Sequence, residues 1–397
     1  MNRRYSDNSP RTGALFGSFE AALGVQAAAW EADVHRLARA LPDGLRLGTS
    51  SWHFPGWAGL VWDRPYNAKR LSREGLAAYA RHPLLGTVGL DRGFYRALSA
   101  GEYAHLGEQV PDSFRFMVKA PAQVTDGLIR TTGGRARAAN PDFLDADLAW
   151  RAFVEPASAG LGDRLGVLVF QISPLPRRWL NDMDALIDRL RGLLARAADG
   201  LGANARAVLA VEVRDPEWLG RPFVAALKQA GATYCLGLHP KMPPIDAQLP
   251  ILRALWPGPF VCRWNLNPRH GAFGYESARA DYAPFDQLID PDPHTRTVLA
   301  RVMAGTVGAG QPVYVTINNK AEGCAPRSVG ELARAVCQAA GQPEAAYACT
   351  WGRCTGPADS RRVRGMPVAG NTRASAWRAR ANSLCCAGDN EFDGMNA

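Results

Sequence analysis

A repeated alternation of short strand patterns with longer helical patterns constrains the fold of this chain more than any other feature. Strands that alternate with helices are typical of a parallel sheet with crossover connections. Eight such units fit a closed barrel better than an open doubly wound sheet, and no G-x-G-x-x-G pattern follows the first strand. The sequence therefore predicts an α/β fold of the TIM type, a (β/α)₈ barrel. The predicted strands span residues 45–50, 84–91, 114–119, 164–172, 206–213, 232–238, 259–264 and 312–318.

Helical patterns separate most of these strands. The connection after residue 238 is the exception, because it is rich in proline and its pattern favours little helix. The predicted helices span about 70–82, 100–109, 143–156, 178–197, 217–230, 282–305 and 326–340.

Segments at both ends of the chain lie outside the predicted barrel. Apolar residues recur on one face between about residues 19 and 40, which predicts a helix that Ser18 caps and that ends before Pro42. The end of the chain is rich in Arg, Ala, Gly, Ser and Asn with little periodicity, which is typical of disorder. We therefore expect an N-terminal helical extension at 1–43, the barrel at 44–345, and a largely disordered tail at 346–397.

The composition favours a globular protein of the cytoplasm. Hydrophobic residues make up 47% of the chain, and no run of about 18 apolar residues predicts a membrane span. Glu20, Glu31 and Asp33 interrupt the stretch where a secretory signal would need an apolar core. The net charge of +9 would suit an anionic partner, although part of the excess lies on the predicted tail. We expect no membrane partner, and the sequence indicates no particular oligomeric state.

The eight cysteines indicate thiols rather than disulfides or a metal site. Cys235 and Cys262 fall inside predicted strands, where a cysteine is usually a small buried apolar residue. Cys349 and Cys354, and the adjacent pair at 385–386, are not matched by a second pair with zinc-site spacing.

Polar side chains gather at the carboxyl ends of the predicted strands, which is where TIM barrels build their sites. Glu212 and Arg214 share one face of the fifth strand because side chains alternate, and Val211 and Val213 take the other. We expect the polar pair to face the barrel mouth, where it forms part of a site or a buried structural ion pair. Further candidates at the other strand ends are Asp91, Lys119, Gln171, Arg263, Asn318 and Asn319.

If these side chains converge, three cations outnumber two carboxylates. A carboxylate beside several cations has a lowered pKa, so Glu212 is a better base, metal ligand or anchor for arginines than a general acid. Lys119, Arg214 and Arg263 would favour a phosphate or carboxylate group on the ligand. Glu212 and Lys119 are the catalytic candidates.

A metal site is the alternative, because barrel hydrolases gather His, Asp and Glu from several strand ends. The candidates are Asp91, Glu212, His239 and His270. The chain has no H-x-H pattern and no paired carboxylates on one strand, and nearby cations would compete with the metal. We therefore expect a metal-free site, and the sequence leaves any cofactor unknown.

Two loops have open interpretations. Trp52, Phe54, Trp57 and Trp62 follow the first strand, and they could stack on a sugar or base or form a hydrophobic plug. The loop 126–142 contains Thr-Thr-Gly-Gly and two arginines, and a mobile surface lid is favoured over a phosphate-binding loop.

Six collinear motifs over residues 45–335 resemble those of the YecE-like family, also called domain of unknown function 72. They are GTSSW with FPGW, TVGLDRGFYR, FRFMVKAP followed by Thr125, LGVLVFQISP, VEVRDPEW and VYVTINNKAEGCAPRS. The resemblance implies a TIM-type barrel with a polar pocket. The residues that it assigns to this pocket are Trp52, Phe94, Tyr95, Arg96, Lys119, Gln171, Glu212, Arg214, Trp218, Arg263, Asn318 and Asn319.

The chain departs from the family pattern at three places. Gly89-Leu90-Asp91-Arg92-Gly93 stands where the family usually has Glu-Ile-Asn-Ser-Thr, Thr125-Asp126 replaces Thr-His, and Trp264-Asn265-Leu266 replaces Leu-His-Gly. A carboxylate and two histidines of the family are therefore missing.

The family has no agreed activity, but its barrel is similar to those of sugar isomerases and apurinic-site endonucleases. We therefore expect a hydrolase or isomerase acting on a phosphorylated or sugar-containing ligand. Tyr95, Arg96, Gln171, Asn318 and Asn319 would contact this ligand beside the cations. A nucleic-acid-binding protein without catalysis and a metal-dependent phosphodiesterase of endonuclease type are the alternatives.

Overall fold

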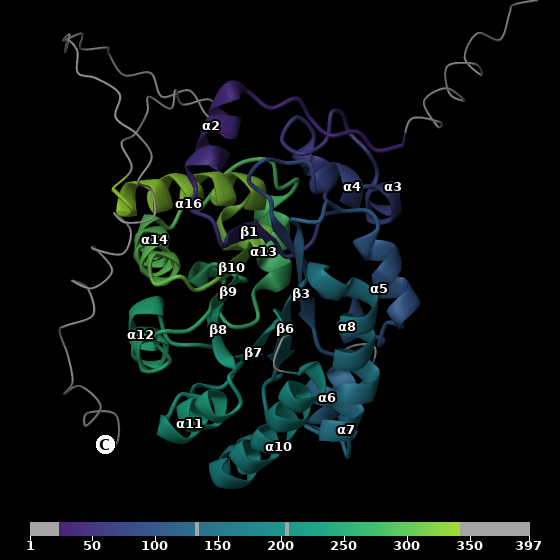
Figure 1. Cartoon of the computed structure of the whole chain (residues 1–397), viewed down its shortest axis with the longest axis vertical. Coiled ribbons are helices and arrows are strands. Elements are labelled where there is room, and N and C mark those ends of the chain that lie inside the picture. The colour runs from purple at the N-terminus through teal and green to yellow at the C-terminus, as the bar shows by residue number, and fades with distance from the viewer. Residues whose placement is uncertain (1–23, 132–134, 203–205, 342–397) are drawn as a thin grey trace, which may run out of the picture.

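The structure is a computed structural model that describes residues 24–131, 135–202 and 206–341. Eight parallel strands close into a barrel in the order β1-β10-β9-β8-β7-β6-β3-β2 (Figure 1). The predicted (β/α)₈ barrel is therefore confirmed, and each predicted strand is present. The strands are β1 (Leu45–Thr49), β2 (Thr87–Leu90), β3 (Arg115–Lys119), β6 (Leu165–Gln171), β7 (Val208–Glu212), β8 (Thr233–Leu238), β9 (Phe260–Trp264) and β10 (Val313–Ile317).

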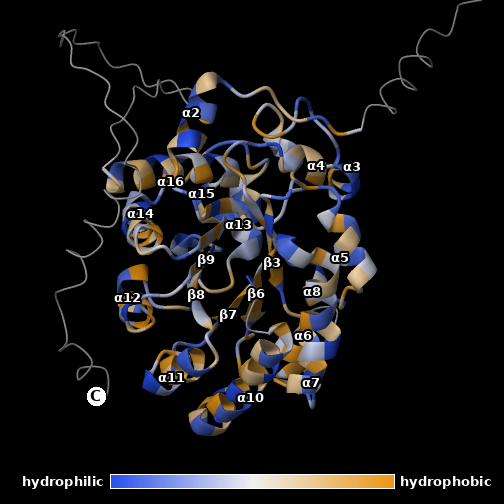
Figure 2. Ribbon diagram, in the orientation of Figure 1, coloured by the Kyte–Doolittle hydropathy of each residue, from blue (hydrophilic) through white to orange (hydrophobic). Residues whose placement is uncertain are grey.

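Helices surround the barrel. Apolar residues of these helices lie toward the barrel, and much of their remaining surface is hydrophilic (Figure 2). A π-helical turn at Trp150–Val154 joins two of the helices. The helices are α2 (Ala32–Ala40), α3 (Ala68–Glu74), α4 (Leu76–Tyr79), α5 (Ala100–Gly107), α6 (Ala122–Thr125), α7 (Ala146–Ala149), α8 (Glu155–Leu161), α9 (Arg177–Leu180), α10 (Met183–Leu201), α11 (Arg221–Gln229), α12 (Ile245–Ala254), α13 (Tyr275–Tyr282), α14 (Pro293–Gly308), α15 (Asn319–Glu322) and α16 (Ala325–Ala339).

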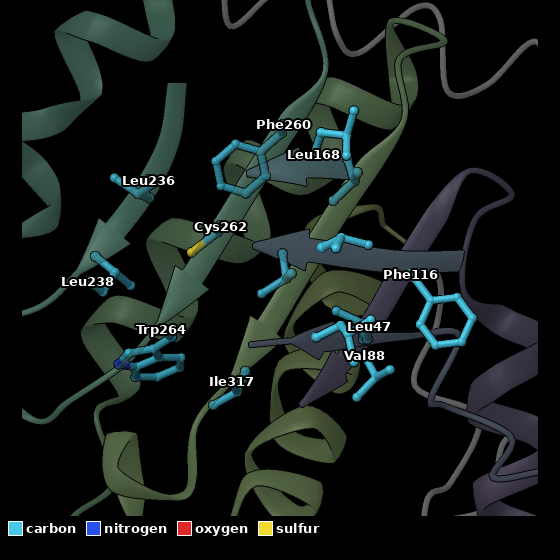
Figure 3. Packing of buried hydrophobic residues seen from close by; sticks show 14 of the residues in the cluster. Leu47, Val88, Phe116, Leu168, Leu236, Leu238, Phe260, Cys262, Trp264 and Ile317 are labelled. Atoms are coloured by element: carbon cyan, nitrogen blue, oxygen red, sulfur yellow. The ribbon is translucent and has the colours of Figure 1, made fainter. Parts of the chain in front are cut away.

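Alternation along the strands separates two clusters of buried apolar residues, and a third, small cluster lies around α13. The larger cluster fills the space between strands and helices, and Figure 3 shows part of it, including Leu47, Phe116, Leu168 and Trp264. The smaller cluster lies on the opposite, inward face of the strands. It consists of Met117, Val167, Val169, Val208, Ala210, Cys235, Val261 and Tyr314. Most of the inward residues that follow these along the strands are polar, and several of them form the site described below.

The connection after β8 forms helix α12, so the prediction of little helix there was wrong. Pro250 lies inside this helix, where the missing N–H normally costs about 3 kcal/mol. Burial of Ile245 and Ile251 stabilises the helix in spite of the proline. Gln248 adds to this, because its Oε1 accepts a 2.6 Å hydrogen bond from the Tyr234 hydroxyl on β8.

The N-terminal helix begins at Ala32, whereas the pattern predicted a helix from residue 19. Residues 24–31 are instead not helical and lie beside residues 60–63. The Ala28 N–H donates to the Val61 carbonyl at 2.9 Å, and the Trp30 indole donates to the Leu60 carbonyl at 2.8 Å. Residues 19–23 and the predicted tail at 346–397 lie outside the described residues, as do Cys349, Cys354 and the pair at 385–386.

The loop after β3 contains an antiparallel hairpin, β4 (Leu128–Arg130) paired with β5 (Ala136–Ala139). Asp126, which stands where the family has a histidine, fixes the base of this hairpin. Its carboxylate accepts from the Leu128 N–H at 3.0 Å and pairs with the Arg130 guanidinium at 2.7 Å. Asp126 therefore has a structural partner in this chain.

None of the helices in the described ranges combines the length and the apolar character that a membrane crossing requires.

Candidate functional site

Glu212 lies at the centre of a buried polar network at the carboxyl ends of the strands. Its side chain is 0% exposed. The Oε1 atom lies 2.6 Å from the Arg214 Nη2 and also accepts from the Asn265 Nδ2 at 3.2 Å. The Oε2 atom accepts from the Arg263 Nη1 at 2.7 Å. Both carboxylate oxygens are therefore occupied by protein donors.

The backbone explains why these side chains meet. Val208 and Ala210 face the barrel interior, and alternation places Glu212 and Arg214 on the same face. Gln171 on β6 is the registered neighbour of Glu212, and its Oε1 accepts from the Arg263 Nη1 at 3.1 Å and from the Arg214 Nη2 at 3.3 Å.

Gly237 on β8 makes the space that the network occupies. A Cβ atom at this position would lie 3.1 Å from the Glu212 Oε1 and 3.2 Å from its Cγ. These contacts are tighter than most side chains tolerate, and fully buried Glu212 has little room to move.

Gly237→Ala should therefore destabilise the protein by about 1–3 kcal/mol through overpacking. Urea unfolding monitored by circular dichroism measures this loss. Gly101→Ala is the matched control, since a Cβ there meets no atom within 4 Å. Equal stability of G237A and wild type would show that the carboxylate can move aside.

Arg263 connects the buried carboxylate to the barrel mouth. Its Nη2 donates to both oxygens of Asp91 at 2.9 and 2.7 Å, and the Asp91 side chain is 40% exposed. Burial opposes the charge on Arg263, but Asp91 and Glu212 together raise its pKa above the usual value. Burial likewise opposes the charge on Glu212, but Arg214 and Arg263 hold the pKa of this carboxyl below its usual value. Both groups are therefore ionised at neutral pH.

Lys119 ends β3 and belongs to the same site, but it is held differently. It is 8% exposed, and its Nζ lies 3.6 Å from the centre of the Phe94 ring. Over the residues that the structure describes, the ammonium of Lys119 makes no hydrogen bond or ion pair. Burial lowers the pKa of Lys119 to about 8; Asp91 and Glu212 oppose this effect, whereas Arg263 and Arg214 reinforce it.

The Arg214 guanidinium retains an unused donor. Its Nη1 is buried and has no hydrogen-bond partner among the described residues. His239, which follows β8, lies against Tyr275 with ring centres 5.6 Å apart and ring planes tilted by 34°. Burial and then Arg214 lower the pKa of His239 to about 4, so this imidazole is neutral at pH 7.

The structure thus brings together seven of the residues singled out in the sequence: Asp91, Phe94, Lys119, Gln171, Glu212, Arg214 and Arg263. The other candidates lie elsewhere or have internal partners. Tyr95 is 88% exposed, and Arg96 pairs with Glu102 on the surface at 2.5 Å. The Asn318 carboxamide accepts from the Lys320 N–H at 3.0 Å at the start of α15.

Asn319 is buried behind the mouth. Its Oδ1 accepts from the Trp57 indole at 3.2 Å and from the Ala325 N–H at 2.8 Å. It therefore joins the loop after β1 to the start of α16. Asn319 therefore also provides the hydrogen-bond partner of Trp57, one of the tryptophans of the aromatic loop.

The aromatic loop forms a hydrophobic plug rather than a stacking platform. Trp57 and Trp62 are fully buried, and the Trp62 indole donates to the Phe54 carbonyl at 2.9 Å. Trp52 is also buried, and its indole donates to the Leu71 carbonyl at 3.1 Å. Trp218 packs in the core against Phe223.

A surface hollow of about 500 Å³ opens beside the segments that follow β1 and β2. Trp52 forms part of its wall, with the Arg92 guanidinium 5.6 Å from the centre of the indole ring. Ser72, Arg73, His105, Leu106 and Gln109 complete the lining.

Asn265 is the functional-site residue that sequence reasoning did not select. It stands where the family has a histidine, and its amide contacts Glu212. The signal was present, because Asn265 lies two residues after Arg263 and therefore on the same face.

The proposed metal ligands do not gather. In the described part of the chain no group of three or more His, Cys, Asp and Glu side chains is arranged to hold a metal ion. Asp91 and Glu212 both contact Arg263, and the His270 ring lies against Tyr282.

Comparisons with known proteins found a matching family model and similar solved structures. The model of the family described as protein of unknown function DUF72 matches residues 46–348. A DUF72 family protein from Enterococcus faecalis V583 is 16% identical; the match covers 74% of this chain and 95% of that chain with a TM-score of 0.48. One from Thermotoga maritima MSB8 is 16% identical over 73% of this chain and 97% of that chain, with a TM-score of 0.45. A search of the curated proteins found no significant match.

The family model covers most of the chain and includes every residue of the polar network. The chain therefore belongs to the DUF72 family of proteins of unknown function, the YecE-like family that its motifs resemble.

Proposed function

We propose that the barrel mouth binds a small anionic ligand, phosphorylated or sugar-containing, and acts on it as a hydrolase or isomerase. The unused Nη1 donor of Arg214 is the observation that carries this proposal. A buried donor without a partner costs about 1–3 kcal/mol. An acceptor oxygen on a ligand would remove this cost.

The charges of the network support an anion as the ligand. Arg214 and Arg263 are balanced by Glu212 and Asp91 through direct ion pairs. Lys119 adds a third cation without adding a carboxylate, so the protonated site has an excess of positive charge. A phosphate or carboxylate group would neutralise it.

Glu212 acts in this proposal as an anchor and not as a base. It has no exposed surface, and its oxygens are occupied by Arg214, Arg263 and Asn265. A general base must reach the proton that it removes, either directly or through one water. Lys119 is the better candidate for chemistry because it has some exposure and no carboxylate partner in the described ranges.

Replacing Arg214 by Gln should weaken the binding of a phosphorylated ligand by about 10- to 100-fold, since hydrogen bonds to charged groups contribute about 1.5–3 kcal/mol. The measurement is thermal unfolding of the full chain in increasing ribose 5-phosphate, with ribose as the neutral comparison. R214K retains the charge and tests whether lost binding reflects damage to the fold. R73Q is the surface control, because Arg73 is exposed.

Stabilisation by ribose 5-phosphate that R214Q leaves unchanged would reject the role of Arg214. A short DNA duplex belongs in the same titration. Binding only to DNA, with a steep salt dependence and no effect of R214Q, would favour the second candidate function instead.

Nucleic-acid binding is that second candidate, and the β4–β5 hairpin favours it. Both strands of this hairpin are largely exposed. Arg137 lies on its second strand, β5, and Arg135 immediately precedes that strand. Two-stranded ribbons fit the major groove, and arginines bind backbone phosphates.

A further inference from the structure

Lys119 has an environment that a lysine kept only for charge balance would not need. Such a lysine would lie against a carboxylate, but both carboxylates of the network are paired with arginines. The Lys119 ammonium lies over the face of Phe94, with its Nζ 3.6 Å from the ring centre. Its Nζ thus points at an aromatic ring in a nearly closed site at the end of a barrel strand.

Burial of Lys119 favours a neutral amine. Burial has the largest effect and lowers the pKa of Lys119; Asp91 and Glu212 stabilise the ammonium, whereas Arg263 and Arg214 destabilise it. The resulting pKa of about 8 leaves roughly a tenth of the side chains as free amine at pH 7. An amine in an apolar site beside other cations is a known way to make lysine nucleophilic.

We propose that Lys119 is a nucleophile that forms a Schiff base with the carbonyl carbon of an anionic oxo compound. This inference rests on the proposed function, because the donors of Arg214 would hold the phosphate or carboxylate group. The ligand class is an oxo acid or an open-chain sugar phosphate, in which a carbonyl lies a few bonds from the anion.

The step balances without a cofactor. The ammonium first gives up a proton, and the amine lone pair attacks the carbonyl carbon to form a carbinolamine. The carbonyl oxygen then leaves as water with two protons that the ammonium carried. The product is an iminium ion, which keeps the single positive charge. No oxidant or reductant takes part, and the iminium withdraws electrons from the adjacent carbon, as an isomerisation requires.

Reductive trapping tests the inference on the full-length protein. The protein is incubated at pH 7 with glyceraldehyde 3-phosphate or pyruvate and sodium cyanoborohydride, which delivers hydride to the iminium and leaves a stable secondary amine. Peptide mass spectrometry locates the adduct. We expect Lys119 to be modified at least tenfold faster than Lys69 and Lys228, which are exposed.

K119R is the matched variant, because it keeps the positive charge and cannot form a Schiff base under these conditions. It should lose the adduct at position 119 and retain stabilisation by ribose 5-phosphate. R214Q should form the adduct more slowly, since the anion is no longer held.

The outcomes separate the two proposals. Wild-type protein that is stabilised by ribose 5-phosphate, but is modified at Lys119 no faster than at Lys69, would overturn the Schiff-base inference and leave the anion site standing. Rapid modification of Lys119 that R214Q does not slow would support the nucleophile but contradict the anion contact. Neither stabilisation nor a selective adduct would overturn both.

Discussion

Glu212→Gln should lower the free energy of unfolding by about 3–5 kcal/mol, the cost of removing one partner from a buried ion pair. The substitution leaves Arg214 without a carboxylate partner in the described part of the chain and leaves Arg263 with Asp91 alone. Buried guanidinium groups cannot be deprotonated to relieve this charge. Urea unfolding at pH 7 measures the loss. Glu74→Gln is the control, since Glu74 pairs with Arg70 at the surface and should contribute less than about 1 kcal/mol.

The effect of Glu212→Gln should also depend on pH. Because the pKa of Glu212 in the folded protein lies below the ordinary value of 4.5, its contribution is complete above that value and is lost as the pH falls through the folded pKa. The difference between wild type and E212Q should therefore shrink in acid. A loss below about 1 kcal/mol at pH 7 would mean that water or ligand oxygens already solvate the arginines.

Lys119→Met should have the opposite effect and raise the free energy of unfolding at pH 7 by about 3 kcal/mol. An ordinary lysine has a pKa of 10.5, and the folded value of about 8 means that the buried ammonium destabilises the native state. Methionine has a similar length and no charge to desolvate. A stability gain on loss of a functional group is the expected mark of a residue kept for activity.

The pH dependence of this gain follows from the same pKa. Below pH 8 both states hold the proton and the penalty is complete; between 8 and 10.5 only the unfolded state holds it, so wild-type stability recovers as pH rises. The advantage of K119M should fall by about half or more between pH 7 and pH 9.5 in urea unfolding. Lys228→Met on the surface of α11 should stay within about 0.5 kcal/mol of wild type at both values. Destabilisation by K119M would show that the contact with Phe94 outweighs the burial of the charge.

Side-chain alternation accounts for the parts of the site that the sequence could predict. Glu212 ends β7 and Arg214 follows two residues later, so the two share a face. Closure of the barrel brings Arg263 and Asp91 to them from distant parts of the chain. The same rule separates Asn318 from Asn319, because Asn318 continues the inward face of β10 and Asn319 continues the outward face.

Other features depend on tertiary contacts that local patterns do not contain. The segment 24–31 has a helical pattern but pairs with residues 60–63, where backbone hydrogen bonds favour an extended chain. The helix α12 forms despite Pro250 because its apolar residues pack against the barrel. The occupation of both Glu212 oxygens, which makes it an anchor, also appears only when the ends of β7 and β9 meet.

The contact between Trp57 and Asn319 has a consequence for the order of assembly. These residues are 262 positions apart in the chain. The Trp57 indole donates to the Asn319 Oδ1, and the same oxygen also accepts from the Ala325 N–H. During synthesis on the ribosome, the loop after the first strand cannot form this hydrogen bond until nearly the whole barrel has emerged. A nascent chain shortened before residue 319 should therefore keep its early tryptophans in a looser, more solvent-quenched environment until the final repeat is added.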